Sequence, residues 1–142
     1  NEVKVLEYNC RFGDPETQPI MMRLKSNLAS LCIAATQGRL DEVAVEWDER
    51  ACLGVVMAAD GYPEKYAKGE KIELPNDSFN SKIFHAGTKI NNNKIYSNGG
   101  RVLCATALGK DIQQAQTRAY EFLEKVDWQG SYYRTDIGFK AI

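Results

Sequence analysis

The first residues alternate between two faces, which predicts a β-strand over residues 3–12. One face carries Val3, Val5, Glu7, Asn9 and Arg11. Gly13 ends this strand, and Asp14-Pro15 follows as a helix-start signal, with the aspartate as N-cap. Apolar residues at helical spacing predict a single helix that continues to Ala35, with Gly38 as its C-terminal cap.

From residue 51 onward the pattern predicts short buried strands and one long helix. Strands are expected at 51–58, 82–87, 94–97 and 101–109. A polar, turn-rich stretch separates the first two, and Asp111 caps a helix that extends to about Val126. A strand–helix unit followed by antiparallel strands with one long helix indicates the α+β class.

The polar, loosely patterned residues 39–49 indicate a boundary. We therefore expect one segment over 1–48 and a second unit over 49–142. The chain begins Asn-Glu-Val, and a strand pattern starts almost at once, which suggests a piece of a longer polypeptide.

The composition of the chain argues against several classes of function. A net charge of −1 favours neither a nucleic-acid partner nor an anionic membrane. No apolar run approaches the roughly 18 residues that a membrane span needs. The 4 cysteines form no CxxC pair, and the single histidine, His85, has no ligand-like neighbour. We expect reduced core cysteines, a cytoplasmic location and a monomer.

Polar residues at every second position of the first predicted strand suggest a binding site for charged groups. Such residues stand about 6.6 Å apart on one face, so Glu7 and Asn9 could converge on a small cation. A carboxylate and an amide oxygen suit Mg²⁺, and Arg11 supplies a fixed positive charge for a phosphoryl group. Val3 and Val5 on this face indicate partial burial. The alternative is the solvated face of an edge strand, and spacing alone leaves both open.

Several segments together resemble one enzyme family. They read EYNCRFGDPETQP near the start, CLGVVMAADGYP at 52–63, FHAGT at 84–88, NGGRVLCATALG at 98–109, and RTDIGFKAI at the end. In this order and spacing, they resemble the phosphoribosylamine–glycine ligases, which are ATP-grasp enzymes of purine biosynthesis. By the resemblance, 1–48 is the last strand and helix of the ATP-grasp domain, and 49–142 is the C-terminal domain.

The resemblance implies a reaction and roles for several residues. ATP with Mg²⁺ or Mn²⁺ activates glycine as an acyl phosphate, which the amine of 5-phosphoribosylamine attacks. Glu7 and Asn9 match metal ligands, and Arg11 matches the arginine that stabilises the transferred phosphoryl group. The substrate-side loop matches Gly13, Asp14, Pro15 and Glu16. The family's other domains are absent from this sequence, so we expect this piece alone to be inactive and its partner to be the remainder of its own ligase chain.

Other interpretations remain open. The chain could belong to another ATP-grasp carboxylate–amine ligase of nucleotide metabolism, or 49–142 could be a non-catalytic interaction module. Gly99-Gly100 is either a phosphate-facing turn, with Arg101 as a substrate contact, or a bulge that leads into a strand. We expect a core or hydrogen-bonded role for His85 and packing roles for the remaining aromatic candidates. Those candidates are Trp47, Trp128, Tyr132 and Tyr133, and we expect Arg134 to pair with Asp136.

Overall fold

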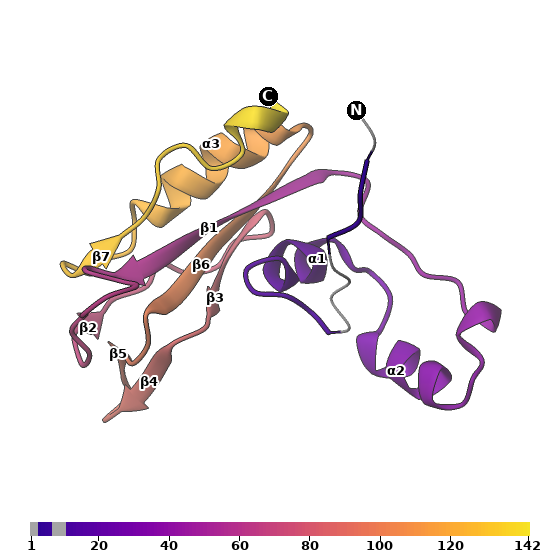
Figure 1. Cartoon of the computed structure of the whole chain (residues 1–142), viewed down its shortest axis with the longest axis horizontal. Coiled ribbons are helices and arrows are strands. Elements are labelled where there is room, and N and C mark those ends of the chain that lie inside the picture. The colour runs from indigo at the N-terminus through magenta and orange to yellow at the C-terminus, as the bar shows by residue number, and fades with distance from the viewer. Residues whose placement is uncertain (1–2, 7–10) are drawn as a thin grey trace.

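The computed structural model describes residues 3–6 and 11–142 (Figure 1). Its helices are α1 (Thr17–Arg23), α2 (Leu28–Thr36) and α3 (Ile112–Leu123), with 3₁₀ turns at Leu40–Glu42 and Phe139–Ala141. Its strands are β1 (Ala51–Ala59), β2 (Lys71–Ile72), β3 (Ser81–His85), β4 (Thr88–Asn91), β5 (Lys94–Ser97), β6 (Arg101–Gly109) and β7 (Ser131–Tyr132). No helix in the described part of the chain is long and apolar enough to cross a bilayer.

The strands form two antiparallel sheets, which confirms the α+β class. The larger sheet has the order β3-β6-β1-β7, and the smaller has the order β2-β5-β4. The two long apolar strands lie at the centre of the larger sheet, where both faces are covered, as their near-continuous apolar sequences require. Ala51 pairs with Gly109 at one end of this ladder, and a register shift follows Met57 at the other end.

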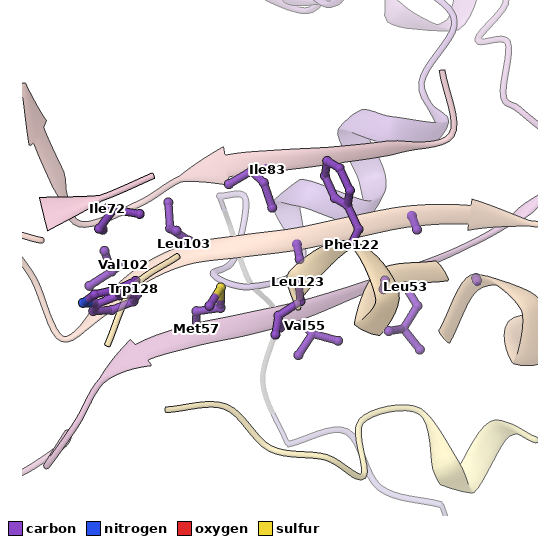
Figure 2. Packing of buried hydrophobic residues seen from close by; sticks show 14 of the residues in the cluster. Leu53, Val55, Met57, Ile72, Ile83, Val102, Leu103, Phe122, Leu123 and Trp128 are labelled. Carbon is purple, nitrogen blue, oxygen red and sulfur yellow. The ribbon is translucent and has the colours of Figure 1, made fainter. Parts of the chain in front are cut away.

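One face of the larger sheet packs on α3 and forms the core (Figure 2). Alternate residues of β1 point to this face, and they meet residues of β6 and the apolar side of α3. Helix α3 begins as predicted, because the Asp111 side chain accepts a hydrogen bond from the backbone N–H of Gln114 at 2.8 Å. The core includes Leu53, Val55, Met57, Ala59, Leu103, Ala105, Ala107, Ala115, Ala119, Phe122, Leu123 and Trp128.

The opposite face of the same sheet receives α1, and Figure 1 shows α1 and α3 on different sides of β1 and β6. Gly54 of β1 makes this close packing possible. A Cβ atom at Gly54 would lie 2.9 Å from Sγ of Cys104 and 3.2 Å from Cγ of Pro19. The absence of a side chain at Gly54 therefore lets the N-terminal segment approach the sheet.

The single helix predicted from Asp14 to Ala35 is wrong. Leu24 is extended and pairs with Trp47, and the backbone N–H of Lys25 donates to the carbonyl of Glu46 at 3.0 Å. Asn27 then caps α2 by accepting from the N–H of Ser30. The helical pattern is interrupted because these backbone groups bond to a distant segment. Gly38, with φ of +66°, follows the end of α2 as expected for a C-terminal cap.

Two further N-terminal expectations need correction. Asp14 is not the helix N-cap, because α1 begins at Thr17 after Glu16, whose side chain makes no capping bond. Residues 3–6 are not in a strand, and Val3 and Val5 are 97% and 67% exposed rather than partly buried. A strand needs a neighbour to pair with, and the described residues provide none for this segment. Residues 7–10 lie outside the described residues.

The strands at β1, β3, β5 and β6 confirm the predicted ones to within a residue or two. The short strands β2, β4 and β7 were not predicted, because they lie in polar or turn-rich sequence. Asn92 and Asn93 have positive φ angles of 48° and 58° and form the turn between β4 and β5. Positive φ at both central residues is what the tight turn of a two-residue β-hairpin requires.

The close packing at Gly54 can be tested by Gly54→Ala. We expect a loss of about 1–3 kcal/mol in the free energy of unfolding, because the new methyl group overlaps the Cys104 sulfur. The measurement is urea unfolding of the wild type, Gly54→Ala, Cys104→Ala and the double variant. Gly54→Ala should cost less in the Cys104→Ala background, and equal costs in both backgrounds would contradict this packing.

Candidate functional site

A cleft of about 250 Å³ lies on the α1 side of the larger sheet. Its floor comes from alternate residues of β1, since the intervening ones face the core. One wall comes from the C-terminal tail, and another from the loop before α1 and the start of β6. The lining residues are Pro15, Gly54, Val56, Ala58, Tyr62, Arg101, Tyr132, Tyr133, Arg134 and Ile137. The cleft thus combines an apolar floor with aromatic side chains and two guanidinium groups.

Arg101 and Asp14, 87 positions apart in the sequence, meet at this cleft. Nε of Arg101 lies 3.2 Å from Oδ2 of Asp14, and NH1 donates to the Asp14 backbone carbonyl at 3.1 Å. Both side chains are a little under half exposed, so the ion pair itself adds at most about 1 kcal/mol of stability. Its main effect is geometric, because it holds the loop before α1 against the first residue of β6.

The loop before α1 is also held by hydrogen bonds between its own residues. The backbone N–H of Gly13 donates to Oε1 of Glu16 at 3.0 Å, and the N–H of Thr17 donates to the Gly13 carbonyl at 3.1 Å. Gly13 is buried beneath the Glu16 side chain, where a Cβ atom would lie 2.4 Å from that carboxyl group. The Glu16 carboxylate therefore serves the loop's own conformation.

The C-terminal tail brings Arg134 to the cleft. Its Nε and NH2 donate to the two carboxylate oxygens of Asp136 at 2.8 and 2.6 Å, which confirms the predicted pair. The guanidinium lowers the pKa of the Asp136 carboxyl through these hydrogen bonds. The hydroxyl of Tyr120 on α3 anchors the tail by donating to the Arg134 carbonyl at 2.6 Å and accepting from the N–H of Ile137 at 3.1 Å.

Sequence reasoning missed the position of Arg134 in the cleft. Asp136 gives this arginine a local partner two residues away, so the sequence pattern indicates no second role. The signal that could have revealed it is the adjacent pair Tyr132-Tyr133, since aromatic residues beside an arginine often line a binding surface.

Of the residues predicted to bind a phosphoryl group or a metal ion, the structure describes only Arg11. Arg11 is exposed, and its NH1 donates to the Phe12 carbonyl at 3.2 Å. Glu7 and Asn9 lie outside the described residues. Within 3–6 and 11–142, no group of three or more His, Cys, Asp or Glu side chains could hold a metal ion.

Other predicted roles have mixed outcomes. His85 is exposed rather than in the core, but its Nδ1 lies 3.0 Å from Oγ1 of Thr88, as a hydrogen-bonded histidine should. Trp128 is 4% exposed and donates from Nε1 to Glu70 at 2.8 Å. Trp47 and Tyr132, which we expected to be packed, are instead about half exposed.

The Gly99-Gly100 turn is a bulge that leads into β6. The Gly100 carbonyl accepts from the N–H of Ala59 at 2.8 Å, and the register of β1 against β6 shifts beside this point. The Tyr62 ring covers Gly100, where a Cβ atom would lie 2.1 Å from the ring. This contact favours the structural interpretation of the two glycines, while the neighbouring Arg101 lines the cleft.

A second surface feature is an apolar groove of about 350 Å³ on the N-terminal segment. The apolar stripe predicted for the single helix lies here, divided between α1 and α2. The stripe faces outward into the groove, and no other described element covers it. We call this the N-terminal groove; it is lined by Phe12, Ile20, Met21, Leu24, Leu28, Leu31, Cys32, Ala35, Leu40, Val45 and Trp47.

Comparison with known proteins identifies related chains. The family model "Phosphoribosylglycinamide synthetase, C domain" matches residues 52–140. Phosphoribosylamine–glycine ligase from Vibrio cholerae is 58% identical over 141 residues, and that from Yersinia pestis is 56% identical over 142 residues. Each alignment covers 98% of this chain. The chain spans about a third (33%) of the length of these curated relatives.

A solved structure shares the fold. The crystal structure of phosphoribosylamine–glycine ligase from Thermotoga maritima is 36% identical to this chain and superposes with a TM-score of 0.74. The superposition covers 93% of this chain and 32% of that one. The small α+β unit with antiparallel sheets is therefore an arrangement that this relative also has.

The cysteines beneath α1 predict how stability depends on pH. Burial raises the pKa of Cys52 to about 12 and that of Cys104 to about 11, from an ordinary value of 9.0. Above about pH 9 these thiols ionise in the unfolded chain but stay protonated in the folded one. The free energy of unfolding therefore falls as the pH rises towards 11–12. We expect urea unfolding to show a loss of up to about 1.4 kcal/mol per pH unit for each thiol.

The double variant Cys52→Ala/Cys104→Ala should lose less stability than the wild type as the pH rises from about 9 to about 11. Cys32→Ala is the matched control for the removal of a cysteine, because Cys32 is an exposed residue of α2. An identical pH dependence in the double variant and the wild type would contradict the prediction.

Proposed function

Since the chain belongs to the phosphoribosylglycinamide synthetase C-domain family, we propose that it is the C-terminal portion of a phosphoribosylamine–glycine ligase. The observation that carries this proposal is the 58% identity over 98% of the chain. The alignment includes the segment before residue 52 as well as the matched C domain. The resemblance of the first residues to the ligase signature therefore has support beyond the motif itself.

The proposed reaction joins glycine to 5-phosphoribosylamine. The γ-phosphoryl group of ATP passes to a carboxylate oxygen of glycine, which gives glycyl phosphate and ADP. The amine of phosphoribosylamine then attacks the acyl carbon, phosphate leaves, and the nitrogen loses a proton to give glycinamide ribonucleotide. A site for this two-step reaction must stabilise charge on a phosphoryl group and hold an amine nucleophile beside an acyl group.

The residues proposed for the phosphoryl side are Arg11, which neutralises charge on the transferred group, and Glu7 and Asn9, which would hold Mg²⁺ or Mn²⁺. Their support is the alternating spacing in the sequence and the match to the family signature. A metal ion held by these residues would supply positive charge that neutralises phosphate oxygens. The fixed charge of Arg11 suits this role because a guanidinium stays protonated and binds phosphoryl oxygens in a planar fork.

The residues proposed for the substrate side are Gly13, Asp14, Glu16 and Arg101. Their support is proximity, since the loop of the first three residues touches Arg101 at the edge of the cleft. Arg101 is the group in this set that could attract a phosphate or carboxylate. The carboxylates of Asp14 and Glu16 already accept hydrogen bonds or an ion pair within the protein, so we propose that they shape the loop.

We propose that 1–48 completes an ATP-grasp domain whose other strands lie in the remainder of the ligase chain. Two observations support this division. The N-terminal groove leaves a large apolar surface open, and residues 3–6 have no strand partner among the described residues. Both features are explained if the missing part of the same chain covers the groove and pairs with the first segment. The unit at 49–142 would then be the C-terminal domain of the ligase.

We further propose that the ligase is a cytoplasmic monomer. The described cysteines, Cys32, Cys52 and Cys104, are free, which fits a reducing compartment. The proposed substrates are small molecules, and the cleft offers no extended basic surface of the kind that nucleic acids require.

Glu7→Gln in the full-length ligase tests the phosphoryl side. We expect glycinamide ribonucleotide formation to fall by at least about a hundredfold, because the substitution removes the charge of a proposed metal ligand. Glu124→Gln is the matched control, since Glu124 is exposed at the end of α3 on the other face of the sheet. Unchanged turnover of Glu7→Gln would favour the interaction-module alternative.

The isolated chain of 142 residues tests the division between this piece and its remainder. We expect no glycinamide ribonucleotide and at most weak binding of Mg²⁺–ATP, because the adenine-binding part of an ATP-grasp site would lie elsewhere in the ligase. The measurement is phosphate release after adding ATP, glycine and phosphoribosylamine, with the full-length ligase as the positive control. Substrate-dependent phosphate release by the isolated chain would refute the expectation.

A further inference from the structure

Gln18 is an unusual residue for its position. It is the only residue of α1 that is buried, with 9% of its surface exposed, although neighbouring positions of this helix are apolar. Its Oε1 atom is buried and has no hydrogen-bond partner among residues 3–6 and 11–142. A buried amide oxygen without a partner destabilises a fold, so an apolar side chain of similar length would be the better choice for packing alone.

The amide nitrogen of Gln18 indicates why a polar residue occupies this place. Nε2 donates to Oδ1 of Asp14 at 3.4 Å, four residues earlier in the loop before α1. The other carboxylate oxygen of Asp14 faces Nε of Arg101 at 3.2 Å. Gln18 and Arg101 therefore bind the same carboxylate from two sides, and the carboxylate cannot rotate without breaking one of these contacts.

The arrangement also fixes Arg101. Its Nε and NH1 are both engaged by Asp14, and NH2 has no hydrogen bond among the described residues. The side chain lines the cleft, so a guanidinium held at two points offers its remaining N–H groups there with little rotational freedom. The order of the contacts runs from Gln18 through Asp14 to Arg101.

We propose that Gln18 is a positioning residue that acts through Asp14 to hold Arg101 in the orientation that binds the anionic group of phosphoribosylamine. This inference rests on the proposed function. It adds a residue whose polar character the sequence pattern did not explain, and it accounts for a buried amide that packing alone does not favour.

The test is Gln18→Met in the full-length ligase. Methionine keeps the length and burial of the side chain but removes the donor to Asp14. We expect kcat/KM for phosphoribosylamine to fall roughly tenfold, less than the hundredfold or so that a 1 Å misplacement of a reacting group can cause. The KM for ATP should not change. The Tm should stay equal or rise, because the unpartnered amide oxygen is gone.

Two further variants separate positioning from a general structural effect. In an Asp14→Ala background, Gln18→Met should have little additional effect on kcat/KM, because the side-chain acceptor that transmits its influence is already absent. Gln113→Met, an exposed glutamine on α3, is the matched control and should behave as the wild type.

The inference is overturned if Gln18→Met keeps full activity, if its loss is equal in the wild-type and Asp14→Ala backgrounds, or if activity falls only together with the Tm. A wild-type full-length chain that forms no glycinamide ribonucleotide would overturn the proposed function as well, and this is established before any variant is made. The two failures are therefore distinguishable.

Discussion

The antiparallel pairing of β1 with β6 is the interaction on which the rest of the structure depends. Successive side chains of a strand point to opposite faces, so the pairing of β1 with β6 places two sets of β1 residues on two faces of the sheet. Leu53, Val55 and Met57 form the core with α3, while the residues between them form the floor of the cleft. A shift of one residue in the register would exchange the two sets and would destroy the core and the cleft together. The stability of the core thus fixes the position of the candidate site.

The contact between Arg101 and Asp14 shows how such a scaffold can position weak interactions. The ion pair is too exposed to hold the loop before α1 by its energy alone. The packing of α1 on the sheet, where Pro19 lies close to Gly54, keeps the loop within reach of β6. The ion pair favours one orientation of the loop within this frame. Positioning at the cleft is therefore a result of close backbone packing, with the polar contacts refining it.

The sequence predicted the elements whose signals are local. The apolar runs of β1 and β6 and the Asp111 cap of α3 carry their own information, and all three were confirmed. The break between α1 and α2 depends on the pairing of Leu24 with Trp47, which no local pattern shows. The roles of Arg134 and Gln18 were missed for a related reason. Each looks like an ordinary polar residue until the fold brings it to the cleft or beneath the loop.

The two parts of the chain differ in how much of their own apolar surface they bury. Every residue of the core cluster lies between Leu53 and Trp128, and Ala34 is the only buried hydrophobic residue described before residue 51. The C-terminal unit therefore has its own core, whereas the N-terminal segment keeps its apolar stripe in an open groove. A segment with so little buried surface gains most of its order from its neighbours. The loop that borders the cleft is attached on one side to a stable sheet through Arg101. Under the proposed function, its other side would contact the remainder of the ligase chain, and we expect a site at such a junction to be complete only when both parts are present.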